Sequence, residues 1–178
     1  KNIVLLVLAV IVGLFVGLNY PLFGLVLFLP LMGYVGFILL RNKGGTDAGA
    51  EASAAARQFT AAPGMAAIYV MRDGFVGGQQ GMNVSVDETL TSQFRTGRFV
   101  RAEVTPGMHV VHAQMASQTK GTAGAAELTL GAGECVLLDA KLNMGAFQGT
   151  VAFLQTRDPG EARAKLAKLK LVEWKAAE

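Results

Sequence analysis

Two uncharged apolar runs near the N-terminus constrain this chain more than any other feature. They cover residues 3–18 and 22–40 and are separated by Asn19-Tyr20-Pro21. At the rise of an α-helix they reach about 24 Å and about 28 Å, against a hydrocarbon thickness of about 30 Å. The pattern predicts a two-helix transmembrane hairpin over residues 1–43. A signal peptide is the alternative for the first run. We disfavour it because no small-x-small cleavage site follows and a second apolar run does.

Basic residues flank the apolar runs. Lys1 precedes the first run, Arg41 and Lys43 follow the second, and the connecting loop has no positive charge. Basic residues next to membrane spans stay on the cytoplasmic side. The sequence therefore predicts a two-span protein of the bacterial inner membrane, with both chain ends and the soluble domain in the cytoplasm.

Small residues recur every four positions in the first run, at Ala9, Gly13 and Gly17. Such a stripe allows another helix to approach closely. We expect it to pack against the second run, and docking against a larger membrane partner is the alternative. Neither run contains an ionisable residue other than tyrosine, which argues against a proton path or the transport of charged substrates.

The distribution of charge limits the classes of partner. The chain has 16 basic and 13 acidic residues. Lys1, Arg41 and Lys43 account for the whole excess, so residues 44–178 are neutral overall and lack the basic patch of a nucleic-acid-binding protein. The single cysteine, Cys135, excludes an intramolecular disulfide framework and a Cys-rich metal site.

Residues 44–63 are rich in glycine and alanine, which predicts a flexible tether. From Gly64 the hydrophobic period changes to two, and glycine-rich turns separate short runs of β-branched and apolar residues. This spacing is typical of an antiparallel β-sandwich, here over residues 64–156. The expected strands are residues 66–72, 83–86, 90–94, 98–104, 108–115, 126–130, 135–142 and 147–155.

Four segments of this region resemble a known family. They are AAIYVMR at 66–72, NVSVD at 83–87, VTPGMHVV at 104–111 and LTLGAGECVLL at 128–138. Together they resemble a bacterial domain of unknown function found mainly in small lipoproteins, and residues 104–111 also resemble the PEGA-type β-sandwich repeat. The resemblance covers about residues 64–156 and implies a small β-sandwich without assigned catalysis. This chain departs from the family because it has apolar runs in place of a lipid anchor.

The C-terminal residues 157–178 predict a basic helix that starts at Asp158-Pro159. Two interpretations remain open. The helix packs on the sandwich with its lysines in solvent, or it forms an interface with anionic headgroups or an acidic partner. The side chains of such an interface would be Lys165, Lys168, Lys170 and Trp174.

No set of residues predicts catalysis, a metal or a cofactor. His109 and His112 are three residues apart, so in a strand they point to opposite faces. Cys135 faces away from the apolar residues that follow it, and no base is evident beside it. Arg95, Arg98 and Arg101 cluster at one turn and strand. Nearby carboxylates, Asp87, Glu88 and Glu103, favour a salt-bridged surface there over an anion site.

Together these patterns predict a non-enzymatic accessory or scaffolding subunit of a larger bacterial membrane protein complex, such as an electron-transport or photosynthetic assembly. The hairpin would dock into that integral membrane complex and its lipid, and the β-sandwich would cover a surface of the partner. The alternative is a stand-alone, membrane-anchored module that binds a peptide or ligand. No nucleic acid and no small-molecule substrate is evident.

Overall fold

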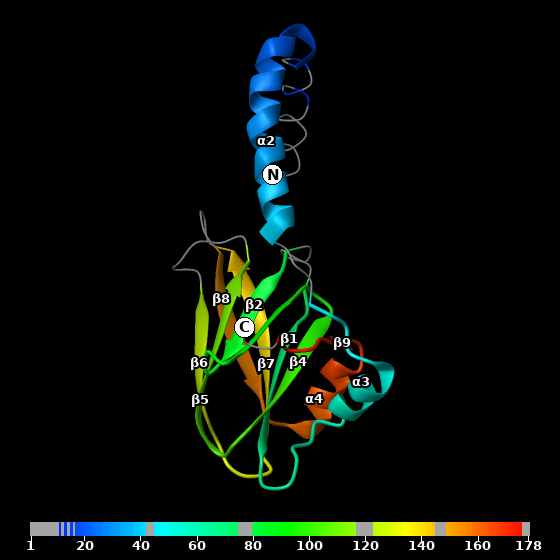
Figure 1. Cartoon of the computed structure of the whole chain (residues 1–178), viewed down its shortest axis with the longest axis vertical. Coiled ribbons are helices and arrows are strands. Elements are labelled where there is room, and N and C mark those ends of the chain that lie inside the picture. The colour runs from blue at the N-terminus through cyan, green and yellow to red at the C-terminus, as the bar shows by residue number, and fades with distance from the viewer. Residues whose placement is uncertain are drawn as a thin grey trace. The chain divides into compact units, whose positions relative to one another are not determined.

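The computed structural model describes residues 11, 13, 15, 17–41, 45–74, 80–116, 123–144 and 149–175. The chain forms two compact units, Lys1–Leu40 and Arg41–Glu178. Figure 1 shows both units with most of their helices and strands labelled. We describe each unit by itself.

The first unit contains the helix α2 (Pro21–Arg41), preceded by helical residues up to Asn19. The side chain of Asn19 donates a hydrogen bond of 2.8 Å to the carbonyl of Phe15. A Cβ atom added to Gly24 would lie 3.3 Å from the Cα of Gly17. Of the predicted packing residues, Gly17 therefore makes a close contact, Gly13 faces open space, and Ala9 lies outside the described residues.

The predicted transmembrane hairpin is wrong. Within the described part of the chain, no helix has the length and hydropathy needed to span a membrane. This finding also removes the two-span location in the inner membrane. Hydropathy along a sequence counts apolar residues and does not by itself establish a membrane span.

Of the three basic residues that flank the apolar runs, the structure describes only Arg41. Arg41 ends α2, while Lys1 and Lys43 lie outside the described residues. The three charges therefore do not set a two-span membrane topology.

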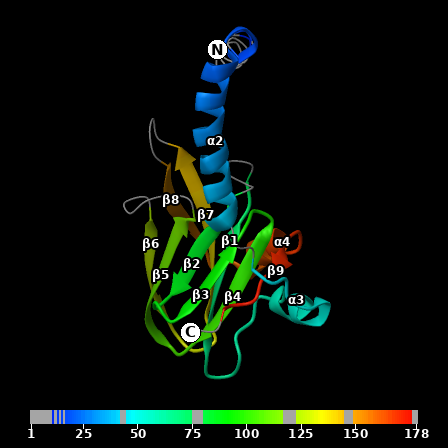
Figure 2. The same cartoon turned by 45° about the horizontal axis from the view of Figure 1, so that its top comes forward.

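The second unit contains nine described strands in two sheets. Figure 2 shows the strands from a second direction, with β3 labelled. One sheet has the order β8-β7-β1-β4-β9 and the other has the order β3-β2-β5-β6. The strands are β1 (Ala66–Arg72), β2 (Met82–Val86), β3 (Leu90–Phe94), β4 (Arg98–Val104), β5 (Gly107–Met115), β6 (Gly124–Leu130), β7 (Cys135–Met144), β8 (Gly149–Thr156) and β9 (Lys170–Leu171).

The period-two pattern located the first eight strands to within a few residues, so this part of the prediction is confirmed. The pairing differs from a purely antiparallel sandwich, because β1 pairs with β7 and β4 pairs with β9 in parallel. Parallel neighbours need a long connection. The chain provides one, since it builds all of β2 to β6 between β1 and β7.

The main core lies between the two sheets. Alternate residues of β1, β4 and β7 face alternate residues of β2, β5 and β6 across it. Strand β1 is buried along its whole length because its other face packs against a second apolar cluster. The helices α3 (Ala50–Ala56) and α4 (Pro159–Leu166) contribute Ala56, Ala162 and Leu166 to that cluster.

The described residues of the expected flexible tether are packed against the sandwich. Gly45 donates a backbone hydrogen bond of 2.8 Å to Gln93, and Ala48 donates one of 2.9 Å to Leu171. The side chain of Phe59 is 4 % exposed in the second cluster. The glycine-rich and alanine-rich composition predicts a flexible segment, but the buried Phe59 side chain and the backbone hydrogen bonds hold the segment in place.

The predicted C-terminal helix is correct at its start and wrong in its length. Asp158 caps α4 by accepting a hydrogen bond of 2.6 Å from the amide of Glu161. The helix ends at Leu166, and the chain then pairs with β4 as β9. The apolar residues beyond Leu166 do not follow a helical period, because Leu169 and Val172 enter two different clusters.

Candidate functional site

The outer face of the sheet β3-β2-β5 carries two rows of polar side chains. Strand register places Gln93, Asn83 and Gln114 side by side in one row. Thr91, Ser85 and His112 form the next row. In β2 the alternate residues Met82, Val84 and Val86 fill the core below. The period-two alternation of the sequence therefore produces an apolar inner face and a hydrogen-bonding outer face.

These rows line an open groove of about 510 Å³. Short side chains, Ser85 and Ala123, form part of its lining, which explains why the surface is hollow there. Longer polar side chains, Glu88, Gln114 and Lys175, also line it. The complete lining is Asn83, Val84, Ser85, Glu88, Thr91, Ser92, Gln93, His112, Ala113, Gln114, Ala123 and Lys175.

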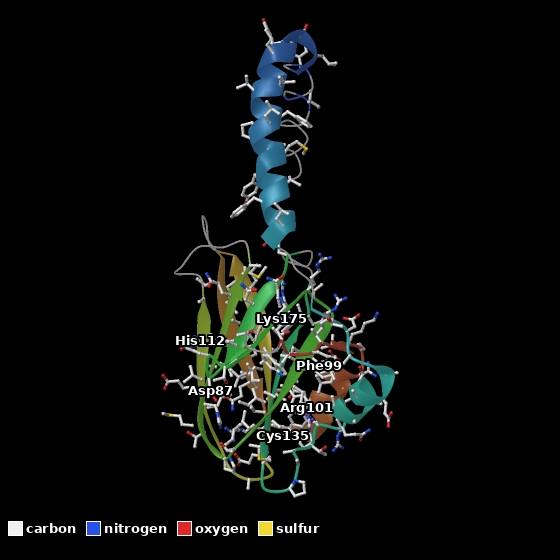
Figure 3. All side chains as sticks on the ribbon, viewed as in Figure 1. Asp87, Phe99, Arg101, His112, Cys135 and Lys175 are labelled. Atoms are coloured by element: carbon white, nitrogen blue, oxygen red, sulfur yellow. The ribbon has the colours of Figure 1, made fainter. Side chains whose placement is uncertain are left out.

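The C-terminal segment completes the groove at the edge of β3. The amide of Lys175 donates a hydrogen bond of 2.8 Å to the carbonyl of Thr91. The hydroxyl of Ser92 donates one of 3.1 Å to the carbonyl of Glu173. Figure 3 labels Lys175 and His112, which belong to this groove. A segment far away in sequence therefore adds an ammonium group to a surface made mainly of amides and hydroxyls, with Glu88 also in its lining.

Within the groove, Gln93 Nε2 donates a hydrogen bond of 2.6 Å to Asn83 Oδ1. This bond orients both amides within the groove. Hydroxyls, amides and an imidazole recognise a polar surface through hydrogen bonds. No cluster of three potential metal ligands occurs in the described ranges, and no hydroxyl of the described groove residues is hydrogen-bonded to His112.

A buried histidine holds the turn beside this groove. His109 Nδ1 lies 2.6 Å from Asp87 Oδ2, and Nε2 lies 2.7 Å from the carbonyl oxygen of Thr105. Both ring nitrogens therefore face acceptors, which is the arrangement of an imidazolium. Burial opposes the charge, but the hydrogen bonds to Asp87 and Thr105 outweigh it and raise the pKa of His109.

The turn itself has an unusual backbone. Asp87 and Glu88 both have positive φ, at 49° and 58°, a region that non-glycine residues rarely adopt. Asp87 Oδ1 also accepts a hydrogen bond of 2.8 Å from the amide of Val110. Burial would raise the pKa of Asp87, but the bonds from His109 and Val110 outweigh it and lower the pKa. The hydrogen bonds that join His109 to Asp87 and Thr105 form an imidazolium clamp at this turn. The clamp positions Glu88 at the rim of the groove.

Cys135 lies on the other outer face of the sandwich, in partial contact with the second apolar cluster. In Figure 3, Cys135 lies apart from His112 and Lys175. Burial raises the pKa of the Cys135 thiol, so the reactive thiolate is disfavoured. Nearby, Tyr69 donates a hydrogen bond of 3.2 Å to the carbonyl of Thr60 and accepts one from Arg101. These contacts fasten the chain entering β1.

The residues of the predicted tail interface differ in their contacts. Trp174 Nε1 donates a hydrogen bond of 2.7 Å to the carbonyl of Arg101, and its ring packs against the main core. Lys165 pairs with Glu161 at 2.7 Å, while Lys168 and Lys170 are exposed. Trp174 thus contributes to the packing of the sandwich, and an interface formed by the four side chains stays a prediction.

The two histidines lie as their spacing predicted, with His109 in the interior and His112 on the outer face. The sequence reasoning missed Asn83, Ser85, Gln93 and Gln114 as members of a site. A signal was present, because three strands carry amides and hydroxyls at alternate positions. Only the register between strands aligns them into rows.

Comparison of the chain with models of protein families, with characterised proteins and with solved structures finds no match. The resemblance to the lipoprotein-type β-sandwich domain therefore stays a prediction.

Proposed function

We propose that this protein is a non-enzymatic accessory or scaffolding subunit whose β-sandwich covers the surface of a larger partner protein. The contact surface would be the outer face of β3-β2-β5. The observation that carries this proposal is the open groove with two aligned rows of polar side chains. Interfaces of this kind gain specificity from hydrogen bonds placed on a rigid support.

The other surfaces of the sandwich support this choice of face. The outer face of β1, β4 and β7 is covered by α3 and α4. The edge of β3 is paired with Gly45 and Lys175 through backbone hydrogen bonds. A partner that extends the sheet at this edge would have to displace those segments, whereas the groove can be contacted without rearrangement.

The exposed side chains of α2 also favour an assembly over a free monomer. Leu22, Leu25, Leu29 and Leu40 are more than half exposed. Large contiguous apolar surfaces of this kind mark interaction sites. A partner that covers them would bind much more tightly than one that contacts the groove alone.

The proposal can be tested by gentle isolation of the full chain from its native cells, followed by native mass measurement. We expect the chain to be recovered with a second protein in fixed stoichiometry. Ser85→Tyr places a large ring in the groove and should release the partner, while Lys168→Gln, an exposed change on the helical side, should retain it. Recovery with lipid but without a second protein would contradict the proposal, as would unchanged complex formation by Ser85→Tyr.

A second candidate is a stand-alone module that binds a small polar ligand or peptide. The groove volume of about 510 Å³ favours it, since small-molecule sites occupy about 300–1,000 Å³. A monodisperse monomer that carries a bound small molecule, lost in Ser85→Tyr, would select this function over the scaffolding role.

A further inference from the structure

A second, smaller cavity lies at the turn between β3 and β4. It has a volume of about 170 Å³ and is lined by Gly45, Phe94, Arg95 and Arg98. The turn brings the two arginines together, because β3 ends at Phe94, β4 begins at Arg98, and Gly97 between them has a φ of +77°. The approach of the chain at Gly45 encloses the cavity from the opposite side.

The three arginines of this region differ in their partners. Arg98 Nε donates a hydrogen bond of 2.8 Å to Asp47, and Arg101 forms an ion pair with Glu103. Arg95 forms no ion pair with any described residue, and its Nε is buried without a hydrogen-bond acceptor. A buried donor that lacks an acceptor is destabilising, so the Arg95 guanidinium has an unused N–H for a group that supplies an acceptor.

We propose that this cavity binds a small oxyanion, the phosphate or carboxylate group of a ligand, through Arg95 and Arg98. The planar fork of a guanidinium matches two oxygens of such a group. Asp47 occupies Nε and Nη2 of Arg98 and leaves Nη1 for the anion. Arg95 supplies the unused Nε–H and carries the larger share of the binding.

The charges around the cavity favour an anion. Arg95 and Arg98 contribute two positive charges, and Lys170 acts on Asp47 from nearby. Asp47 is the opposing carboxylate, and the hydrogen bond from Arg98 lowers its pKa. Asp47 therefore neutralises one arginine and leaves a net positive charge at the cavity. This site is separate from the polar groove, and its test does not depend on the scaffolding role.

The test is the thermal unfolding of the full chain in inorganic phosphate, in acetate and in chloride at one constant ionic strength. At ten times the dissociation constant, we expect phosphate or acetate to raise the Tm by about 3 °C over chloride. A larger effect of phosphate would identify a phosphate group as the ligand chemistry, and a larger effect of acetate would identify a carboxylate. Equal Tm values in the three salts would overturn the proposal.

Variants of the arginines make the test specific. Arg95→Gln should abolish the response, and Arg95→Lys, which keeps the charge but loses the fork, should weaken binding about tenfold. Arg157→Gln is the matched control, because it removes an equal charge from an arginine paired with Glu134. Retention of the response by folded Arg95→Gln, or its loss in Arg157→Gln, would overturn the proposal. If Arg95→Gln fails to fold, titration of Arg95→Lys by calorimetry decides, and an unchanged affinity would overturn it.

Discussion

The two outer faces of the sandwich differ in what covers them. On the sheet that contains β1, the outward residues Tyr69, Phe99 and Leu137 are apolar and fully buried, and helices cover them. On the sheet that contains β2, the outward residues Asn83 and His112 are polar and line an open groove. Both faces arise from the same alternation along strands. The chemistry of the outward residues decides whether a face recruits a further layer or contacts solvent and partners.

The aromatic side chains explain how the covered face holds its layer. The rings of Phe59 and Tyr69 are 4.9 Å apart between centroids, and those of Tyr69 and Phe99 are 6.5 Å apart. Phe59 lies outside the sheet, in the segment before β1, and therefore connects that segment to the sheet. Large apolar rings bury enough surface to offset the ordering of such a segment.

The largest difference between the faces should appear in Phe99→Ala. Removal of a buried phenyl ring from the covered face should lower the free energy of unfolding by about 3–5 kcal/mol. The matched change on the open face, Ser85→Ala, should lower it by less than about 0.5 kcal/mol. Urea unfolding followed by circular dichroism measures both. Similar losses would show that the two faces contribute alike to stability.

A smaller effect should come from His109, which holds the turn at the end of the open sheet. His109→Gln cannot donate to both Asp87 and Thr105 and should lose about 1–2 kcal/mol near pH 6, after allowance for the partial exposure of Asp87. The raised pKa of His109 means that its contribution is complete below the unfolded value of about 6.5. That contribution is lost as the pH rises through the folded value.

Asp87 gives the opposite dependence at low pH. Its pKa is lowered, so its contribution is present above the unfolded value and is lost as the pH falls through the folded value. Unfolding free energies measured from pH 3 to pH 9 should therefore pass through a maximum that His109→Gln flattens on the alkaline side. A profile of equal shape in both proteins would contradict the imidazolium clamp.

The smallest effect concerns the layer on the covered face. Asp158 caps α4, and Asp158→Ala should lower the free energy of unfolding by about 1 kcal/mol. Asp158→Asn keeps an acceptor for the amide of Glu161 and should retain most of the stability. Hydrogen exchange of the α4 amides would localise the loss. Faster exchange in the groove strands, with α4 unchanged, would contradict the claim that Asp158 stabilises the helix on the covered face.

Much of the sandwich was predictable because strand patterns are local. The alternation of Val100, Ala102 and Val104 with Arg101 and Glu103 predicted both the strand and its inward face, and all three apolar residues are in the main core. The start of α4 was equally local, since Asp158 and Pro159 act on the adjacent turn. Local signals of this kind need no knowledge of the rest of the chain.

The membrane hairpin is the main wrong prediction, because apolar composition alone does not establish a membrane span. The C-terminal segment failed for a different reason. The predicted helix over residues 157–178 includes Leu169 and Val172. Both lie beyond the observed end of α4, and each is buried in a different apolar cluster. The pairing of Lys170 and Leu171 with β4 depends on a strand about 70 residues away, which no local pattern reveals.

By itself, the sequence determined where the strands lie and which of their residues face inward, because both depend on the two-residue period of a β-strand. Only the tertiary structure decided which strands are neighbours, and therefore that Gln93, Asn83 and Gln114 share a row and that Arg95 and Arg98 share a cavity. The physical reason is that pairing between strands depends on contacts distant in sequence, which burial of the whole core selects together.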